Sequence, residues 1–164
     1  MDKVSHPFPP VVDAGCHTLI LGSFPSVKSR ENEFYYGHPQ NRFWRVLAAV
    51  FGEAVPEDIP EKKALLLRHG LALWDVIASC EIEGSSDASV RNAVPVDIAQ
   101  VTGVAPIRRV ICNGALASKL YRKHLQPLTG IEALTAPSTS PANAAWTPER
   151  LTAAWQTLLN KKEE

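Results

Sequence analysis

The sequence lacks net charge, paired cysteines and long hydrophobic runs, and each absence excludes a class of protein. Its 17 basic and 17 acidic residues cancel, which argues against a protein that coats nucleic acid through bulk charge, although a local basic patch is still allowed. The three cysteines lie far apart, at Cys16, Cys80 and Cys112. No pair has the spacing of metal ligands, and a four-cysteine iron–sulfur site is excluded. We therefore expect no metal and no other cofactor.

Segments that would direct the chain to a membrane or out of the cell are also missing. The first residues include Asp2 and Lys3 and contain no hydrophobic signal region. No apolar run approaches the length of a transmembrane helix. Because an odd number of cysteines also suits a reducing compartment, we expect a cytoplasmic protein without a membrane partner. We expect it to be a monomer.

What the chain does contain is enough apolar material for one folded domain. Hydrophobic residues make up 45% of its 164 positions, which suffices for a core and argues against disorder. We expect a single domain over residues 1–164, with no internal repeat and no linker. Residues 1–16 contain Pro7, Pro9 and Pro10 and are expected to form an irregular lead-in.

Short apolar runs alternate with segments of helical periodicity. Strands are expected at 17–21, 71–76, 109–112 and 131–136, the second of which also fits a strand-to-helix junction. Helices are expected at 41–51, 60–69, 97–100, 115–124 and from Thr147 onward. Loops are expected at 22–40, 83–92 and 137–141. The alternation predicts an α/β fold of three α/β/α layers with a central, mainly parallel, four-stranded sheet.

Three polar segments follow strands of this sheet and should converge, because ligands of such sheets bind beyond the carboxyl ends of the strands. In segment 22–26, Gly22 would let the backbone approach a ligand closely, although an ordinary turn fits equally well. Asn113 carries a donor and an acceptor that could read a base edge, or it could cap the following helix. The hydroxyl-rich loop 137–141 could grip a backbone phosphate, or it could be a plain loop.

The segment that leads into the first long helix is the most informative. The ring of Tyr36 offers a flat face on which a base could stack, worth roughly 1–3 kcal/mol. Asn41 lies at the mouth of the helix, where its amide could hold a water molecule; from chemistry alone, helix capping is its commoner role. Lone carboxylates are usually structural, so Asp75, Glu81 and Glu83 receive no catalytic role. Phosphate-loop, dinucleotide-binding and Gly-x-Ser-x-Gly motifs are absent.

Taken together, these motifs resemble the uracil-DNA glycosylase superfamily, and within it the hypoxanthine-DNA glycosylase (DNA-deoxyinosine glycosylase) branch. Residues 19–26 are similar to the first motif of that branch. Residues 35–44 are similar to the His-Pro-x-Asn-x-Phe-Trp signature that the branch shares with mismatch-specific uracil glycosylases. Asn113 matches a strand-end asparagine that binds the base, and residues 137–143 stand where the second motif belongs. The resemblance extends over residues 19–155.

The chain departs from the superfamily pattern in two places. Ser23 and Phe24 stand where the classical first motif has a catalytic Asp or Asn, and neither polarises water as a carboxylate or amide would. In the second motif, residues 138–140 replace His-Pro-Ser or Asn-Pro-Ser. Both departures match the hypoxanthine branch, and the resemblance implies that the catalytic asparagine comes from the His-Pro-x-Asn run. That residue is Asn41.

The resemblance implies a monofunctional glycosylase that hydrolyses the bond between a deaminated base, hypoxanthine above all, and its sugar in DNA. Asn41 would orient the attacking water. The flipped base is expected to contact Gly22, Ser23, Phe24, Tyr36 and Asn113. The DNA backbone is expected to contact Pro25, Ser26, Lys28, Ser138, Thr139 and Ser140, with Arg30 as a further candidate.

Other functions fit the same residues. The enzyme could act mainly on uracil or xanthine. The pocket could bind a damaged base without cleaving it, since the first-motif Asp or Asn is missing. The chain could also be a small α/β domain that binds a free nucleotide.

Overall fold

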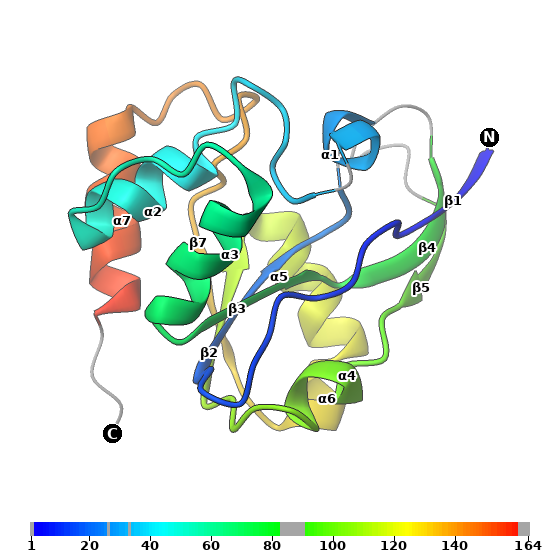
Figure 1. Ribbon diagram of the computed structural model, residues 1–164. Helices are drawn as coiled ribbons and strands as arrows, with labels where there is room; N and C mark the ends of the chain where they lie inside the picture. Colours follow the sequence, from blue (N-terminus) through cyan, green and yellow to red (C-terminus); the bar gives the residue numbers. More distant parts are fainter. Residues whose placement is uncertain (1, 26, 33, 83–90, 161–164) are drawn as a thin grey trace.

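The computed structural model of the protein describes residues 2–25, 27–32, 34–82 and 91–160 (Figure 1). Its centre is a four-stranded sheet in the order β3-β2-β6-β7, and every neighbouring pair is parallel. The strands are β2 (Thr18–Gly22), β3 (Leu71–Asp75), β6 (Arg109–Asn113) and β7 (Ala133–Ala136). All residues of β2 and β3 are buried. This explains why their sequences are continuous apolar runs rather than alternating ones.

Helices cover both faces of this sheet. Figure 1 shows α2 (Phe43–Phe51), α3 (Ile59–Arg68) and α7 (Pro148–Leu159) on one side and α5 (Ala115–His124) with α6 (Gln126–Thr129) on the other. The predicted start of α7 is confirmed, because the Thr147 hydroxyl accepts a hydrogen bond from the Arg150 N–H and Pro148 opens the helix. The three-layer α/β/α arrangement and its parallel sheet are likewise confirmed. Among the described residues, no helix has the length and apolar character needed to cross a membrane.

A second sheet was not expected from the sequence. Its order is β1-β4-β5, with both pairs antiparallel, and it comprises β1 (Asp2–Ser5), β4 (Ile77–Ile82) and β5 (Arg91–Pro95). Residues 2–5 of the predicted irregular lead-in therefore form a strand. The signal is weak because β4 mixes the buried Ile77 and Cys80 with half-buried Ser79 and Glu81, and its pairing with β5 is broken by register shifts. Of the loop predicted at 83–92, residues 83–90 lie outside the described residues, and the last two belong to β5.

Smaller differences concern helices. The segment predicted as one long loop, 22–40, contains the short helix α1 (Val27–Asn32), and α6 was also not expected. The short helix predicted at 97–100 is observed two residues later along the chain as α4 (Ala99–Thr102). The fourth predicted strand, at 131–136, begins only at Ala133.

The rest of the lead-in lies across the domain. Val11 forms an isolated antiparallel bridge with Leu73 of β3, and Phe8 is buried in the core. The rings of Phe8 and Tyr35 meet edge to face with their centroids 4.6 Å apart. These contacts bring His6 to the carboxyl end of β3, where the candidate site lies.

Candidate active site

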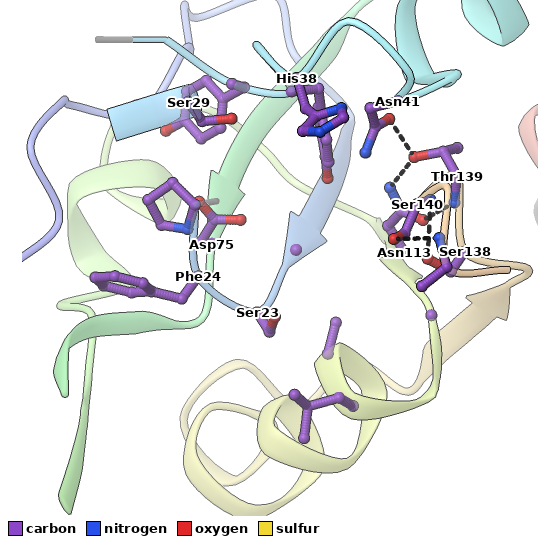
Figure 2. Close-up of a pocket in the computed structure, with 18 of the residues that line it drawn as sticks. Ser23, Phe24, Ser29, His38, Asn41, Asp75, Asn113, Ser138, Thr139 and Ser140 are labelled. Atoms are coloured by element: carbon purple, nitrogen blue, oxygen red, sulfur yellow. Dashed lines mark hydrogen bonds between the residues drawn. The ribbon is translucent and has the colours of Figure 1, made fainter. Parts of the chain in front are cut away.

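A cavity of about 400 Å³ opens at the carboxyl ends of the parallel strands. Gly22, Asp75 and Asn113 are the last residues of β2, β3 and β6, and all three line it. The other lining residues come from the segment after β2, the entrance to α2, the start of α5 and the loop after β7. The expected convergence of three polar segments is therefore observed. Figure 2 shows Asn41, Asn113, Ser138 and Thr139 on one side of the cavity, and Phe24 and Asp75 on the other.

The first side, which we call the amide wall, is formed by Asn41, Asn113 and the hydroxyl residues 138–140. The Thr139 N–H donates to Asn113 Oδ1 at 3.1 Å, and Asn113 Nδ2 donates to Thr139 Oγ1 at 3.0 Å. The Thr139 hydroxyl in turn donates to Asn41 Oδ1 at 2.9 Å. Thr139 itself has no exposed surface. The wall is thus a neutral hydrogen-bonded network centred on one buried hydroxyl.

Asn41 has two roles at once. Its Oδ1 accepts the Phe43 N–H at 2.9 Å at the start of α2, as well as the Thr139 hydroxyl. Its amide also lines the cavity, and Figure 2 shows the nitrogen turned toward the cavity and away from Thr139. A hydrogen bond to the first N–H of α2 and exposure to the site are therefore compatible in this residue.

Arg42 holds the loop that carries the wall. Its backbone N–H donates to the Thr139 carbonyl at 3.1 Å. Its guanidinium donates to the carbonyls of Ser140, at 3.0 Å, Asn143, at 3.1 Å, and Trp146. A guanidinium engaged with three carbonyls positions the loop 139–146 against the entrance to α2.

The opposite side, which we call the carboxylate wall, is formed by Gly22, Phe24 and Asp75, and His6 contacts Asp75 from outside the cavity lining. Asp75 is only 4% exposed, and its Oδ2 lies 2.8 Å from His6 Nε2. A β-carbon on Gly22 would lie 2.3 Å from Asp75 Oδ1. Gly22 is therefore required at this position by the close approach of the carboxylate rather than by backbone conformation.

Tyr36 lies between the two walls. Its ring stacks on Phe43 with centroids 4.1 Å apart, so one face is already covered. Its φ of 54° lies in the left-handed region, where strain in a bulky residue is often associated with functional sites. Burial, and then the charge of Asp75, raise the pKa of the phenol, while Asn113 offsets part of the rise. The phenol thus stays neutral, and its buried hydroxyl lies near the Asn113 amide but forms no hydrogen bond of normal geometry with the described residues.

Comparisons with known proteins place this geometry in a family. The family model for the uracil DNA glycosylase superfamily matches residues 9–159, which is most of the chain. The chain belongs to the uracil DNA glycosylase superfamily.

Relatives within the superfamily cover from about two thirds to nearly all of the chain. A hypoxanthine DNA glycosylase from Methanosarcina acetivorans is 37% identical over 145 residues, covering 87% of this chain and 90% of the relative. A hypoxanthine DNA glycosylase from Methanosarcina barkeri is 35% identical over 109 residues, covering 65% and 69%. The solution NMR structure of a Methanosarcina acetivorans protein assigned to the uracil DNA glycosylases superposes with a TM-score of 0.80 at 32% identity, covering 96% of this chain and 97% of that one.

Most of the residues singled out from the sequence line this cavity. They are Gly22, Ser23, Phe24, Pro25, Tyr36, Asn41, Asn113, Ser138, Thr139 and Ser140. Ser26 lies outside the described residues, and so does the side chain of Lys28. The Arg30 guanidinium lies over the Phe24 ring, 5.7 Å from its centroid.

The structure changes the expectation for two of these residues. The Thr139 side chain is fully buried between Asn41 and Asn113, so its hydroxyl cannot reach a DNA phosphate. Asn113 was expected to present its whole amide to a base. One donor and one acceptor of that amide are already taken by Thr139, which leaves one N–H and one lone pair.

Sequence reasoning missed the pair of His6 and Asp75. The available signal was the position of Asp75, a carboxylate at the end of a fully buried strand. The partner could not be inferred, because His6 reaches the site only through the fold of the N-terminal segment. No cluster of three or more His, Cys, Asp or Glu side chains in the described part of the chain is placed to hold a metal ion.

Proposed function

We propose that this protein is a monofunctional DNA glycosylase that removes hypoxanthine from deoxyinosine in DNA by hydrolysing the N-glycosidic bond. The observation that carries the proposal is the placement of Asn41 in one cavity with Asn113 and Ser138. The 37% identity to a hypoxanthine DNA glycosylase over most of both chains supports the choice of base.

The cavity suits a base that has left the double helix. Its volume of about 400 Å³ lies within the usual range for small-molecule sites, roughly 300–1,000 Å³. An extruded nucleotide costs a few kcal/mol of stacking and pairing, and a mispaired deaminated base costs least. We expect the base to lie between the two walls, with its polar edge near the remaining N–H of Asn113.

The reaction separates the base from C1′ of the sugar. The electron pair of the C1′–N9 bond leaves with the base, and the sugar acquires oxocarbenium character, as in other glycoside hydrolysis. The oxygen of a water molecule then bonds to C1′, and the proton it releases balances the charge on the base. Asn41 is the proposed catalytic residue because its amide borders the space where these atoms would meet.

The proposal includes hydrolysis without strand cleavage. No lysine is found among the described residues that line the cavity. An amine nucleophile is what a glycosylase would need to form a Schiff base with the sugar. We therefore expect an intact abasic strand as the product.

DNA would be held mainly at the rim of the cavity. Ser138 and Ser140 are partly exposed, and hydroxyl groups commonly contact backbone phosphates. The formal net charge of zero predicts modest affinity for undamaged DNA. Contacts from Ser26 and Lys28 remain predictions.

The test is a panel of duplexes that each carry one hypoxanthine, uracil or xanthine, followed by alkali to reveal abasic sites. Wild-type protein should release hypoxanthine fastest and cut no strand before alkali. Asn41→Ala should lose most of the single-turnover rate, by about 10²–10³-fold if it removes one transition-state hydrogen bond. Gln40→Ala, which changes an exposed neighbour on the same segment, is the matched control and should behave as wild type.

Three outcomes would overturn the proposal. Faster release of uracil or xanthine would move the enzyme to another substrate within the superfamily. Tight binding of inosine-containing DNA without release of base would indicate a binding module. A normal single-turnover rate for Asn41→Ala would remove Asn41 from the mechanism.

A further inference from the structure

The hydrogen bonds of the amide wall have a fixed direction that begins at a backbone group. A backbone N–H can only donate, so the Thr139 N–H determines that the oxygen of Asn113 faces it, at 3.1 Å. The nitrogen of Asn113 then faces the Thr139 hydroxyl, at 3.0 Å, and donates to it. The orientation of Asn113 is therefore set by the main chain.

The same logic continues to Asn41. The Thr139 hydroxyl has a single proton, and because its oxygen accepts from Asn113, that proton goes to Asn41 Oδ1 at 2.9 Å. A second backbone donor, the Phe43 N–H, also meets Asn41 Oδ1 at 2.9 Å. Two donors converge on the oxygen of Asn41, so the end left for the cavity is Nδ2, as Figure 2 shows.

We propose that Thr139 is a positioning residue that makes Asn41 a hydrogen-bond donor toward the substrate. The inference rests on the proposed function and adds to it the direction of the hydrogen bond between Asn41 and the substrate. An N–H cannot take a proton from water, so Asn41 does not act as a base. A donor stabilises atoms on which negative charge grows, and in this reaction the electron pair of the C1′–N9 bond moves onto the departing base.

Asn41 is therefore assigned to the leaving group, through one of the purine acceptor atoms, rather than to the attacking water. The water proton goes to the base or to solvent and not to Asn41. Thr139 contacts neither the sugar nor the base in this scheme. Together with the Phe43 N–H, it holds the amide of Asn41 in one of its two orientations.

The first test removes the Thr139 hydroxyl at nearly constant volume. Thr139→Val should lower the single-turnover rate on inosine-containing duplex by up to about 100-fold, because the Asn41 amide keeps only the Phe43 N–H of its two orienting donors and is held less firmly. Thr139→Ser restores the hydroxyl and should recover most of the rate. Thr18→Val, which removes another fully buried hydroxyl, from a residue that does not line the cavity, controls for a general loss of packing and should retain the wild-type rate.

A double substitution separates positioning from structural support. If Thr139 acts through Asn41, adding Thr139→Val to Asn41→Ala should cause little further loss, since the two effects are not additive. An equal loss in both backgrounds would overturn the proposal.

The second test replaces the hydrogen-bond donor of Asn41 by an acceptor. It does not depend on whether Thr139→Val folds. Asn41→Asp would keep an oxygen on Thr139 and Phe43 and present the other oxygen to the cavity. At neutral pH it should be no faster than Asn41→Ala. As the pH falls and the carboxyl group becomes protonated, it regains a donor, so its rate should rise toward acid pH more steeply than that of wild type.

The outcomes distinguish this inference from the proposed function. If wild-type protein releases no hypoxanthine, the proposed function fails. If wild type is active and Asn41→Asp is as fast as wild type at neutral pH, Asn41 works as an acceptor and the inference alone fails. A Thr139→Val variant as fast as wild type would contradict it in the same way.

Discussion

The two walls of the cavity hold their polar groups in different ways. In the amide wall the groups are neutral, and their directions are dictated by backbone N–H donors at Thr139 and Phe43. At the carboxylate wall, Asp75 is paired with His6, and both side chains are buried, with exposures of 6% for His6 and 5% for Asp75. A neutral network costs little to bury once its hydrogen bonds are made, whereas a buried carboxylate depends on its partner. We therefore expect substitutions in the amide wall to affect catalysis first, and those in the carboxylate wall to affect stability first.

The largest effect on the free energy of unfolding is expected when Asp75 of the carboxylate wall is replaced. Asp75→Ala leaves His6 buried without its partner, and breaking a buried pair in this way typically costs about 3–5 kcal/mol. Urea unfolding should show that loss in the free energy of unfolding. Glu132→Ala, at an exposed acidic residue, is the control. If Asp75→Ala lowered the free energy of unfolding by less than about 1 kcal/mol, as for exposed pairs, the stability of the protein would not depend on the buried pair, and the expected difference between the walls would be wrong.

A smaller effect is expected from crowding the same wall. In Gly22→Ala the new β-carbon would lie 2.3 Å from Asp75 Oδ1, and that carboxylate is the end of a short side chain already bound to His6. Overpacking of this kind typically costs about 1–3 kcal/mol. It should also narrow the cavity and slow base release. Gly15→Ala, where the nearest atom would be 3.4 Å away, should change neither quantity; a wild-type rate and stability for Gly22→Ala would contradict the close approach.

Removal of the phenol oxygen of Tyr36, which lies between the walls, should have opposite effects on the stability of the fold and on the binding of DNA. Tyr36→Phe deletes a buried hydroxyl that has no hydrogen-bond partner in the described part of the chain. Stability should stay constant or rise, by about 1 kcal/mol at most. If the neutral phenol donates to the base, binding of inosine-containing DNA should weaken about fivefold, the equivalent of about 1 kcal/mol. Titration of the Asn41→Ala protein with and without Tyr36→Phe measures this without turnover, and a loss of stability would indicate a structural role for the hydroxyl.

Some parts of the molecule could be predicted from the sequence and others could not, for physical reasons that differ from element to element. Strands β2 and β3 were predictable because helices cover both faces of the sheet and force continuous apolar runs. The second sheet was not, because β1 and β4 pair across 74 to 80 positions of sequence with mixed polar and apolar residues. Asn41 and Asn113 were found as residues, since strand ends and helix entrances are recognisable in a sequence.

The arrangement of those residues was beyond sequence reasoning. The direction of each amide depends on where two backbone N–H groups lie, and neither position follows from residue identity. The contact between His6 and Asp75 could not be predicted, because it requires the N-terminal segment to cross the domain, as the bridge between Val11 and Leu73 shows.

The smallest effect is expected at a second histidine–carboxylate pair, which tests whether burial is what distinguishes the carboxylate wall. Glu53 lies against His69 and Arg68, and the His69 and Glu53 side chains are 28% and 27% exposed. Hydrogen bonds from His69 and then Arg68 hold the pKa of Glu53 below its ordinary value. A carboxyl group whose pKa is lowered by folding stabilises the protein above its unfolded pKa, and that contribution disappears as the pH falls through the folded pKa.

Glu53→Gln should therefore lower the urea midpoint only slightly at neutral pH, and the difference from wild type should vanish in acid. High salt should also reduce it, because exposed pairs are screened. Unfolding curves at neutral and acid pH, with and without added salt, measure both trends. If Glu53→Gln destabilises the protein as much as Asp75→Ala, then burial does not separate the two His–carboxylate pairs, and the distinction between the walls must rest on something other than desolvation of the carboxylate.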